Sequence, residues 1–296
     1  MSFNTKLKIA CIGAGKMLTA LISGLVAQGY PPGHIIATRR DLSALEYLAK
    51  RLAIQVTADN AHAAAQADII ILGVKPKQVV AVLPELQPCC QGKLIVSILA
   101  GVSVHSLQLG LASGTETATG LSVIRAMPNL PCQITQGITG LFAAVGVSAE
   151  HKQWVQNLFA VVGKTLWLQQ EAMMHVLTVV SGSGPAYFFL LQEYLMSFAC
   201  QQGFARDEAE TLVQQTMLGA AMMSGQCKED VSTLRAMITS PGGVTEEVMH
   251  YLKQHNLEQI WSAALTSGRV HSHMLAQNGD ARNDAKNTEQ LKKNSD

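Results

Sequence analysis

Short, almost unbroken apolar runs alternate with amphipathic stretches through the first half of the 296-residue chain, and this alternation limits the fold more than any other feature. The strongest runs are ADIIILGV at 67–74, KLIVSIL at 93–99 and LKIACIG at 7–13. A strand that is apolar at every position has both faces buried, which is typical of a parallel sheet covered by helices on both sides. The first half therefore predicts an α/β domain built on a parallel sheet.

Weaker patterns fill in the rest of this half. The sequence predicts further strands at 34–39, 55–59, 121–127 and 138–145, and helices at 17–28, 43–52 and 78–86. From Glu171 onward the pattern changes, because apolar residues recur every three or four positions and no stretch reads as a strand. The second half therefore predicts an all-α domain.

The change in composition near 166–170 sets the expected domain boundary. We expect a nucleotide-binding domain at 1–168 and a helical domain at 169–276. The remaining residues, 277–296, are polar and rich in asparagine, so we expect a disordered tail.

Composition narrows the class of partner. A formal net charge of +1 gives no reason to expect nucleic acid or an anionic membrane as a partner. The six cysteines show neither C-x-x-C spacing nor the pattern of a disulfide scaffold, and the chain has no paired Cys and His spacing that suggests a metal. The run after Lys8 is too short for a signal peptide, and no uninterrupted apolar run reaches the roughly 18 residues of a membrane helix. A cytoplasmic protein without a bound metal is expected.

The first strand leads into GAGKML, residues 13–18, at the expected start of a helix. Gly13 permits a tight strand-to-helix turn, and Gly15 lets the backbone approach a pyrophosphate at the positive end of the helix. Leu18 stands where the third glycine of G-x-G-x-x-G usually lies, so the motif by itself is weak. Its place after the first strand favours a dinucleotide site over a purely structural turn.

The end of the second strand, ATRRD, bears on which dinucleotide binds. An NAD site usually has an acidic residue here, whereas this chain has Thr38, Arg39 and Arg40. Two guanidinium groups can hold a 2′-phosphate, which favours NADPH, although two solvated arginines would give the same sequence. Asp41 is interpreted as a cap for the next helix.

Three later loops fall at the carboxyl ends of strands, where open α/β sheets bind ligands: residues 74–76, 99–101 and 126–129. In the helical half, SGSGPAY at 181–187 should end one helix and begin another. A close helix crossing explains its glycines nearly as well as ligand contact does. His175 is interpreted as a packed histidine rather than a general acid. His271 and His273 are interpreted as surface residues.

The segment ITSPGGVTEEV, at 238–248, interrupts the helical pattern with a proline and two glycines. The N–H groups that follow such a turn can hold an anion where the next helix begins. Glu246 and Glu247 fit the first turn of that helix, and we expect both to point away from the anion.

Together with GAGKM, the ordered motifs TADN (57–60), GVKP (73–76), SILAG (97–101), RAMPNLP (125–131), SGSGPAY and TSPGG (239–243) make the chain resemble the pyrroline-5-carboxylate reductases, from about Ile9 to about His273. The resemblance implies NAD(P)H-dependent reduction of 1-pyrroline-5-carboxylate to L-proline, the last step of proline synthesis. It also implies an N-terminal Rossmann-like domain and a C-terminal helical domain that intertwines with a second subunit. Family members form dimers, often assembled further into decamers.

Carried over by residue, the resemblance places cofactor contacts at Gly13, Ala14, Gly15, Lys16, Met17, Leu18, Thr38, Arg39, Asn60, Val74, Lys75, Pro76, Ala100 and Gly101, to which the charge argument adds Arg40. It places substrate contacts at Ser240, Gly243, Val244 and Thr245, with Glu171 a weaker match. The N–H groups of 243–245 would hold the substrate carboxylate, and the Thr245 hydroxyl would lie beside the ring nitrogen as the catalytic group. NADPH is the expected cofactor, with NADH as an alternative.

The chain also departs from the family pattern. Leu130 and Val244 replace residues that are commonly threonine or small, Ala236 and Met237 stand where polar residues usually precede TSPGG, and His175 replaces an acidic residue. Two other hypotheses therefore stay open. One is a reductase of another small cyclic imino acid, and the other is a paralogue that binds NADP(H) without catalysis.

Overall fold

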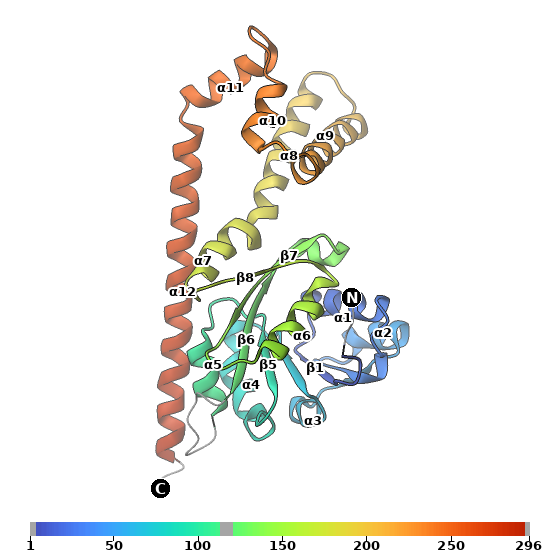
Figure 1. Cartoon of the computed structure of the whole chain (residues 1–296), viewed down its shortest axis with the longest axis vertical. Helices are drawn as coiled ribbons and strands as arrows, with labels where there is room; N and C mark the ends of the chain where they lie inside the picture. The colour runs from blue at the N-terminus through green and yellow to red at the C-terminus, as the bar shows by residue number, and fades with distance from the viewer. Residues whose placement is uncertain (1–3, 113–120, 294–296) are drawn as a thin grey trace. The chain divides into compact units, whose positions relative to one another are not determined.

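The computed structural model of the chain describes the backbone of residues 4–112 and 121–293, and side chains as far as Gln277. Its contacts divide the chain into two compact units. The first unit combines Met1–Gly182 with Arg269–Asp296, and the second is Ser183–Gly268. Figure 1 shows the elements of both units.

An eight-stranded sheet forms the centre of the first unit, in the order β3-β2-β1-β4-β5-β6-β7-β8. The strands are β1 (Ile9–Ile12), β2 (Ile35–Thr38), β3 (Gln55–Thr57), β4 (Ile69–Leu72), β5 (Leu94–Ser97), β6 (Ser122–Pro128), β7 (Gly137–Ala143) and β8 (Gly163–Trp167). Strands β1, β2, β4 and β5 are buried at every position, which confirms the reading of the apolar runs. All the sequence-predicted strands are present within a few residues of their expected ends.

The sheet is not wholly parallel, which corrects the simplest form of the prediction. Strand β7 pairs with β6 antiparallel, with Ala126 opposite Leu141. The connection between them is only residues 129–136, too short for the crossover that a parallel neighbour needs. Strand β8, which the sequence analysis missed, returns parallel to β7 through a helix.

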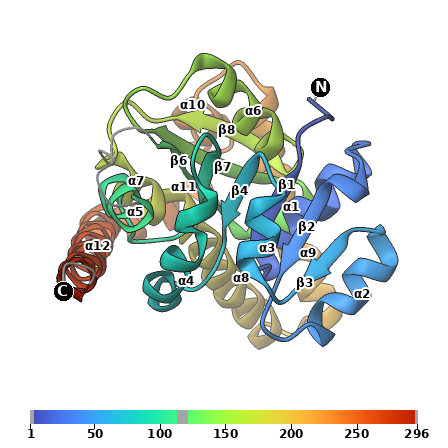
Figure 2. The ribbon, with the colours of Figure 1, turned by 90° about the horizontal axis from the view of Figure 1, so that it is seen from below.

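Helices cover both faces of the sheet (Figure 2). On one side, α1 (Lys16–Ala27) contacts both α2 (Ser43–Leu52) and α6 (Ala149–Ala160). Helices α3 (Asn60–Ala65), α4 (Val79–Leu86) and α5 (Val104–Leu111) pack together on the other. Short turns of 3-10 helix, η1 (Pro32–His34), η2 (Pro76–Gln78), η3 (Gln87–Cys89) and η5 (Leu130–Ile134), lie in the connections. The sequence analysis did not predict α3, α5 or α6.

The first unit extends beyond the predicted boundary at 168. Helix α7 (Met173–Leu177) and the π-helical turn η6 (Thr178–Gly182) belong to it. The reason is packing, because Met174 and Leu177 form a buried cluster with Leu168 that packs against Met127 and Phe142 of the sheet. Contacts therefore divide the chain after Gly182 rather than after 168.

The second unit is helical, as predicted. It contains α8 (Gly184–Gln201), α9 (Arg206–Gln226), α10 (Val231–Met237), α11 (Val244–Gln254) and the start of α12 (Leu257–Lys293). Ala209 and Val213 of α9 are buried, and the Tyr187 ring meets the Trp261 ring edge-on at a centroid distance of 5.6 Å. Many large apolar side chains of this unit are exposed: Phe188, Phe189, Leu191, Tyr194, Phe198, Leu212, Leu218, Met222, Met223, Tyr251 and Ile260. By length and composition alone, Met173–Gln201 is the one helical segment in the described part that is apolar enough to cross a membrane.

Helix α12 is 37 residues long. From Arg269 onward it belongs to the first unit, where Leu275 and Ala276 lie against Gly101. The backbone stays helical from 277 to 293, where the sequence analysis expected disorder. Helix formers such as Ala, Glu, Gln and Lys recur there, and extending an existing helix costs much less than starting one.

Candidate active site

The turn between β1 and α1 has the geometry of an anion-binding cradle. Gly13 has a φ of +77°, and a Cβ there would lie 2.4 Å from Val74 Cγ1 and 2.9 Å from the Val74 backbone, so no side chain fits. Gly15 precedes the helix, and a Cβ on it would meet only Gly13 O, at 4.0 Å. No side chain caps α1 and no acidic residue lies in its first turn. The positive end of α1 therefore faces open space that suits a phosphate.

Leu18 occupies the place of the usual third glycine and is 1% exposed. The space that it fills is provided by Gly73, which follows β4. A Cβ on Gly73 would lie 2.4 Å from Leu18 Cδ1 and 2.8 Å from Leu18 Cγ. The motif requires helix and strand to approach closely. Here the glycine that allows this approach lies at the end of the strand, and the larger leucine lies on the helix. Leu18 packs beneath the turn, whereas Lys16 at the helix start is exposed.

A chain of hydrogen bonds holds this turn. The Gly13 N–H donates to Thr38 Oγ1 at 3.1 Å, and the Thr38 hydroxyl donates to Asn60 Oδ1 at 2.6 Å. The Asn60 amide donates to Glu85 Oε2 of α4 at 2.9 Å. Thr38 is 0% exposed, so its side chain supports the turn and presents no surface to a ligand. Sequence reasoning missed Glu85, since nothing in VLPEL at 82–86 indicates that it meets a residue 25 positions earlier.

The two arginines after β2 are exposed, as a role in binding a 2′-phosphate requires. Asp41 accepts from the Ser43 N–H at 3.1 Å and from the Ser43 hydroxyl at 2.5 Å, at the start of α2. These bonds, with the charge of Arg39, lower the pKa of Asp41. The prediction that Asp41 caps this helix is wrong, because Leu42 is the N-cap residue of α2 and no side chain caps the helix; Asp41 lies one position earlier and bonds to Ser43. Its carboxylate is engaged there, which fits an NADPH site better than an NAD site.

The predicted loops after β4 and β5 lie at the same edge of the sheet as Gly13, because β1, β4 and β5 are parallel neighbours. Lys75, Pro76 and Ala100 are exposed, and Val74 is half-buried against Gly13. Asn60 begins α3 at this edge. In the loop after β6, Asn129 has a structural role. Its side chain donates to Ser181 O at 3.1 Å and accepts from the Ile138 N–H at 3.0 Å.

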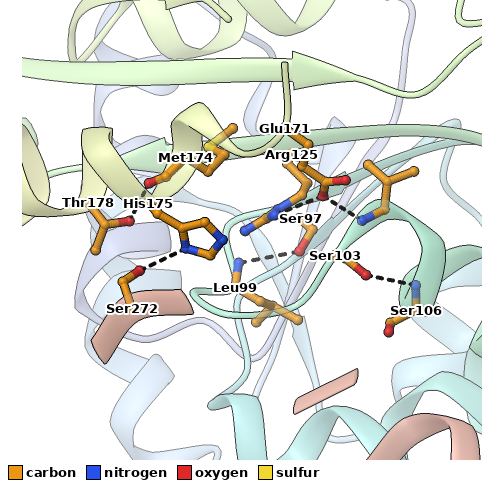
Figure 3. Close-up of polar contacts among 11 residues, drawn as sticks. Ser97, Leu99, Ser103, Ser106, Arg125, Glu171, Met174, His175, Thr178 and Ser272 are labelled. Carbon is orange, nitrogen blue, oxygen red and sulfur yellow. Dashed lines mark hydrogen bonds and ion pairs between the residues drawn. The ribbon is translucent and has the colours of Figure 1, made fainter. Parts of the chain in front are cut away.

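Glu171 lies in a polar centre of the first unit, shown in Figure 3. Its Oε1 accepts from Arg125 Nη1 at 2.8 Å and from the Val104 N–H at 2.7 Å. Arg125 is 7% exposed and the Glu171 side chain is partly exposed, so the guanidinium side of this ion pair is largely desolvated; the pair joins β6 to the connection before α7. This engagement favours a structural role for Glu171 over the substrate contact that the resemblance implies.

His175 is packed, as expected. Its Nδ1 lies 3.0 Å from Ser272 Oγ of α12 (Figure 3). Its ring also meets the His273 ring edge-on at a centroid distance of 5.2 Å. The pKa of His175 is lowered mainly by burial, and further by the charges of His273, Arg125 and Arg269. The exposed positions of His271 and His273 agree with their interpretation as surface residues.

SGSGPAY divides two helices, as predicted. The π-helical turn ends at Gly182, and α8 begins at Gly184 with Pro185 in its first turn. A Cβ on Gly182 would lie 3.3 Å from Met127 Cε. In the first unit this glycine therefore permits a close packing contact, which is one of the two readings left open by the sequence.

The TSPGG loop lies in the second unit, between α10 and α11. Gly242 has a φ of +71°, and the Gly243 N–H donates to Ser240 O at 3.0 Å. Within the described residues, the next two N–H groups, of Val244 and Thr245, have no intramolecular acceptor. Two of the three predicted carboxylate donors are therefore available.

Glu246 does not point away from this loop, which corrects our expectation. Its Oε2 accepts from the Gly242 N–H at 2.7 Å, so its carboxylate folds back onto the turn. No such contact is formed by Glu247 among the described residues. The Ser240 side chain is exposed and Thr245 is half-buried. In the part of the chain that the structure describes, no group of three His, Cys, Asp or Glu side chains is placed to hold a metal ion.

Comparison with known proteins gives a consistent picture. Residues 171–275 match the family described as pyrroline-5-carboxylate reductase dimerisation, and residues 8–101 match the family described as NADP oxidoreductase coenzyme F420-dependent. A pyrroline-5-carboxylate reductase of Vibrio alginolyticus is 40% identical over 260 residues, which cover 87% of this chain and 93% of that protein.

Solved structures of pyrroline-5-carboxylate reductases resemble this chain as well. A pyrroline-5-carboxylate reductase from Coxiella burnetii has a TM-score of 0.85 and 34% identity, and the match covers 91% of this chain and 98% of that one. The pyrroline carboxylate reductase of Plasmodium falciparum, solved with NADP bound, has a TM-score of 0.81 and 25% identity, with 92% and 99% of the two chains covered.

Proposed function

The chain belongs to the pyrroline-5-carboxylate reductase family, and we propose that it reduces 1-pyrroline-5-carboxylate to L-proline with NADPH. The observation that carries the proposal is a pair of anion-binding backbone turns in one chain. One is the Gly13 turn at the start of α1, and the other is the Gly242 turn at the start of α11. The first suits a dinucleotide pyrophosphate and the second suits a substrate carboxylate.

The first unit has the features that NADPH needs. Room for the pyrophosphate exists where a Cβ on Gly15 would find almost no neighbour, and α1 begins there without an acidic residue. Exposed Arg39 and Arg40 supply positive charge for the 2′-phosphate, which supports NADPH over NADH. Lys75, Pro76, Ala100 and Gly101 border the same edge of the sheet. When bound, NADPH supplies the hydride.

The residues of the second unit are assigned to the imino acid. The N–H groups of Val244 and Thr245 hold the carboxylate, and the exposed Ser240 hydroxyl adds a further hydrogen bond. The Thr245 hydroxyl lies beside the ring nitrogen and accepts a hydrogen bond from it. The ring nitrogen enters protonated, so hydride addition to the C=N carbon moves the π electrons to nitrogen and gives the neutral amine. Orientation then supplies most of the catalysis.

The second unit also supports assembly into a homodimer. Its exposed apolar residues lie within 171–275, the range that matches the dimerisation family, and a second copy of the chain would cover them. The same coverage accounts for the apolar segment Met173–Gln201 without a membrane. We assign cofactor binding to the sheet-containing unit and dimerisation to the helical unit. We further propose that dimers assemble into a decamer.

The six cysteines are free and the net charge is near zero, which supports a cytoplasmic protein that needs neither nucleic acid nor membrane.

One assay tests the reaction. NADPH oxidation is followed by absorbance with the five-membered imino acid, with its six-membered homologue and with NADH in place of NADPH. The proposal expects turnover with the five-membered substrate and a higher kcat/KM with NADPH. Tight NADPH binding without turnover would refute the reductase activity, and equal use of both dinucleotides would refute only the role of the arginines.

Thr245→Ala tests the catalytic assignment. Loss of one hydrogen bond to the reacting nitrogen should lower kcat/KM by roughly 10- to 100-fold without unfolding the helix. Thr216→Ala is the matched control, because the Thr216 hydroxyl donates to Leu212 O within its own helix, α9. Unchanged kinetics in Thr245→Ala, or equal losses in both variants, would contradict the role of Thr245.

A further inference from the structure

We propose that Glu85 is a positioning residue for the dinucleotide, which acts through the Asn60 amide and the Thr38 hydroxyl on the turn at Gly13. This inference rests on the proposed function, because it assumes that the Gly13 turn holds NADPH. Glu85 lies on α4, away from the glycine motif in sequence, and its carboxylate reaches Asn60 Nδ2 at 2.9 Å.

The three hydrogen bonds of this chain can run in only one direction. A backbone N–H is always a donor, so Thr38 Oγ1 must accept from Gly13, and the hydroxyl proton is free to point at Asn60 Oδ1. The Asn60 amide therefore presents its NH₂ group to Glu85, and an ionised carboxylate can only accept. The carboxylate thus selects the one amide orientation that matches the Thr38 hydroxyl.

Thr38 supports the cradle at two successive residues, and the Asn60 orientation acts on the first of them. The Thr38 side chain takes the N–H of Gly13, and the Thr38 carbonyl takes the N–H of Ala14 at 2.8 Å. Gly15 and the start of α1 follow directly. The Asn60 backbone is fixed separately, since Asp59 caps α3 through the His62 N–H at 2.9 Å. What Glu85 adds is control of the Asn60 side chain.

The environment of Glu85 separates this role from a contribution to folding. Its side chain is exposed, and no Lys or Arg in the described part of the chain lies within ion-pair distance of it. Removing the carboxylate leaves no cavity and no unpaired buried charge. The loss should therefore appear in nucleotide affinity and leave the stability of the apoprotein nearly unchanged.

The test compares Glu85→Ala and Glu85→Gln with the wild-type protein. NADPH binding is measured directly by titration without substrate, and KM is measured separately for NADPH and for the imino acid. Loss of one charge-assisted hydrogen bond should weaken NADPH binding about three- to tenfold in Glu85→Ala. The KM for the imino acid and the thermal midpoint should stay unchanged, and Glu85→Gln, which retains an acceptor, should recover most of the affinity. Glu150→Ala, at an exposed glutamate in the first turn of α6, is the control.

A second variant makes the pathway itself falsifiable. Because Glu85 acts through Asn60, adding Glu85→Ala to Asn60→Ala should cause no further loss of NADPH affinity. Additive losses, equal changes in both KM values, or a lowered thermal midpoint with unchanged affinity would each overturn the proposal. If the wild-type protein binds NADPH but does not turn over, the reductase proposal fails while the titrations still decide the role of Glu85. A wild-type protein that does not bind NADPH would overturn both.

Discussion

Gly73→Ala tests whether the leucine in the glycine motif depends on a glycine across the contact. The added Cβ would lie 2.4 Å from Leu18 Cδ1 and 2.8 Å from Leu18 Cγ, with Ile98 Cδ1 at 3.4 Å. Leu18 is 1% exposed, so its side chain has little room to withdraw. Overpacking of this kind costs about 1–3 kcal/mol, which we expect as a lower free energy of unfolding in denaturant.

A double-mutant cycle separates this contact from a general effect of alanine. Leu18→Ala alone should cost about 2–5 kcal/mol, because it empties a buried site. In the double variant the alanine Cβ partly fills that space, so the combined loss should be smaller than the sum by about 1–3 kcal/mol. Gly33→Ala is the matched control, since a Cβ there has no neighbour within 4 Å. Additive losses, or a Gly73→Ala protein as stable as the control, would refute the exchange of glycine and leucine.

Two further predictions concern ionisable side chains. Glu246→Gln keeps an acceptor for the Gly242 N–H but removes a negative charge beside the proposed carboxylate site, so the KM for the imino acid should fall roughly two- to fivefold. Glu247→Gln, one residue further along the same turn, should change KM less, and equal effects would contradict a local role. The pKa of His175 is lowered in the folded protein, so protonation of this histidine favours the unfolded chain. The contribution of neutral His175 to the free energy of unfolding is therefore full above the ordinary pKa of 6.5 and is lost as the pH falls below that value. Thermal midpoints between about pH 8 and about pH 5 should therefore fall less in His175→Asn than in the wild type, and parallel curves would contradict this.

The sequence predicted well those features that depend on neighbouring residues. The apolar runs identified the buried strands, and the spacing of glycines and prolines located the turns at Gly13, Gly182 and Gly242. These features are local, because a strand with two buried faces must be apolar throughout and a left-handed residue favours glycine. Strand β8 escaped prediction because GKTLW alternates half-buried with exposed positions, and the antiparallel direction of β7 escaped it because pairing direction depends on the connection.

The candidate site shows the same division. By itself the sequence determined the two glycine turns, the exposed arginines after β2 and the start of the helix that follows Asp41. Only the tertiary structure decided that Glu171 pairs with Arg125 and that Glu246 turns back onto Gly242. Whether a carboxylate can meet a ligand depends on which donors it already has.

The partners that the sequence could not supply are distant along the chain. Leu18 finds its space at Gly73, and Asn60 is oriented by Glu85, 25 residues away. The local sequence pattern determines which backbone conformations are allowed at each position, because backbone sterics and burial act on each residue and its neighbours. Side-chain partners are chosen only when strands and helices from separate segments pack together, so packing decided that Leu18 meets Gly73 and that Asn60 meets Glu85.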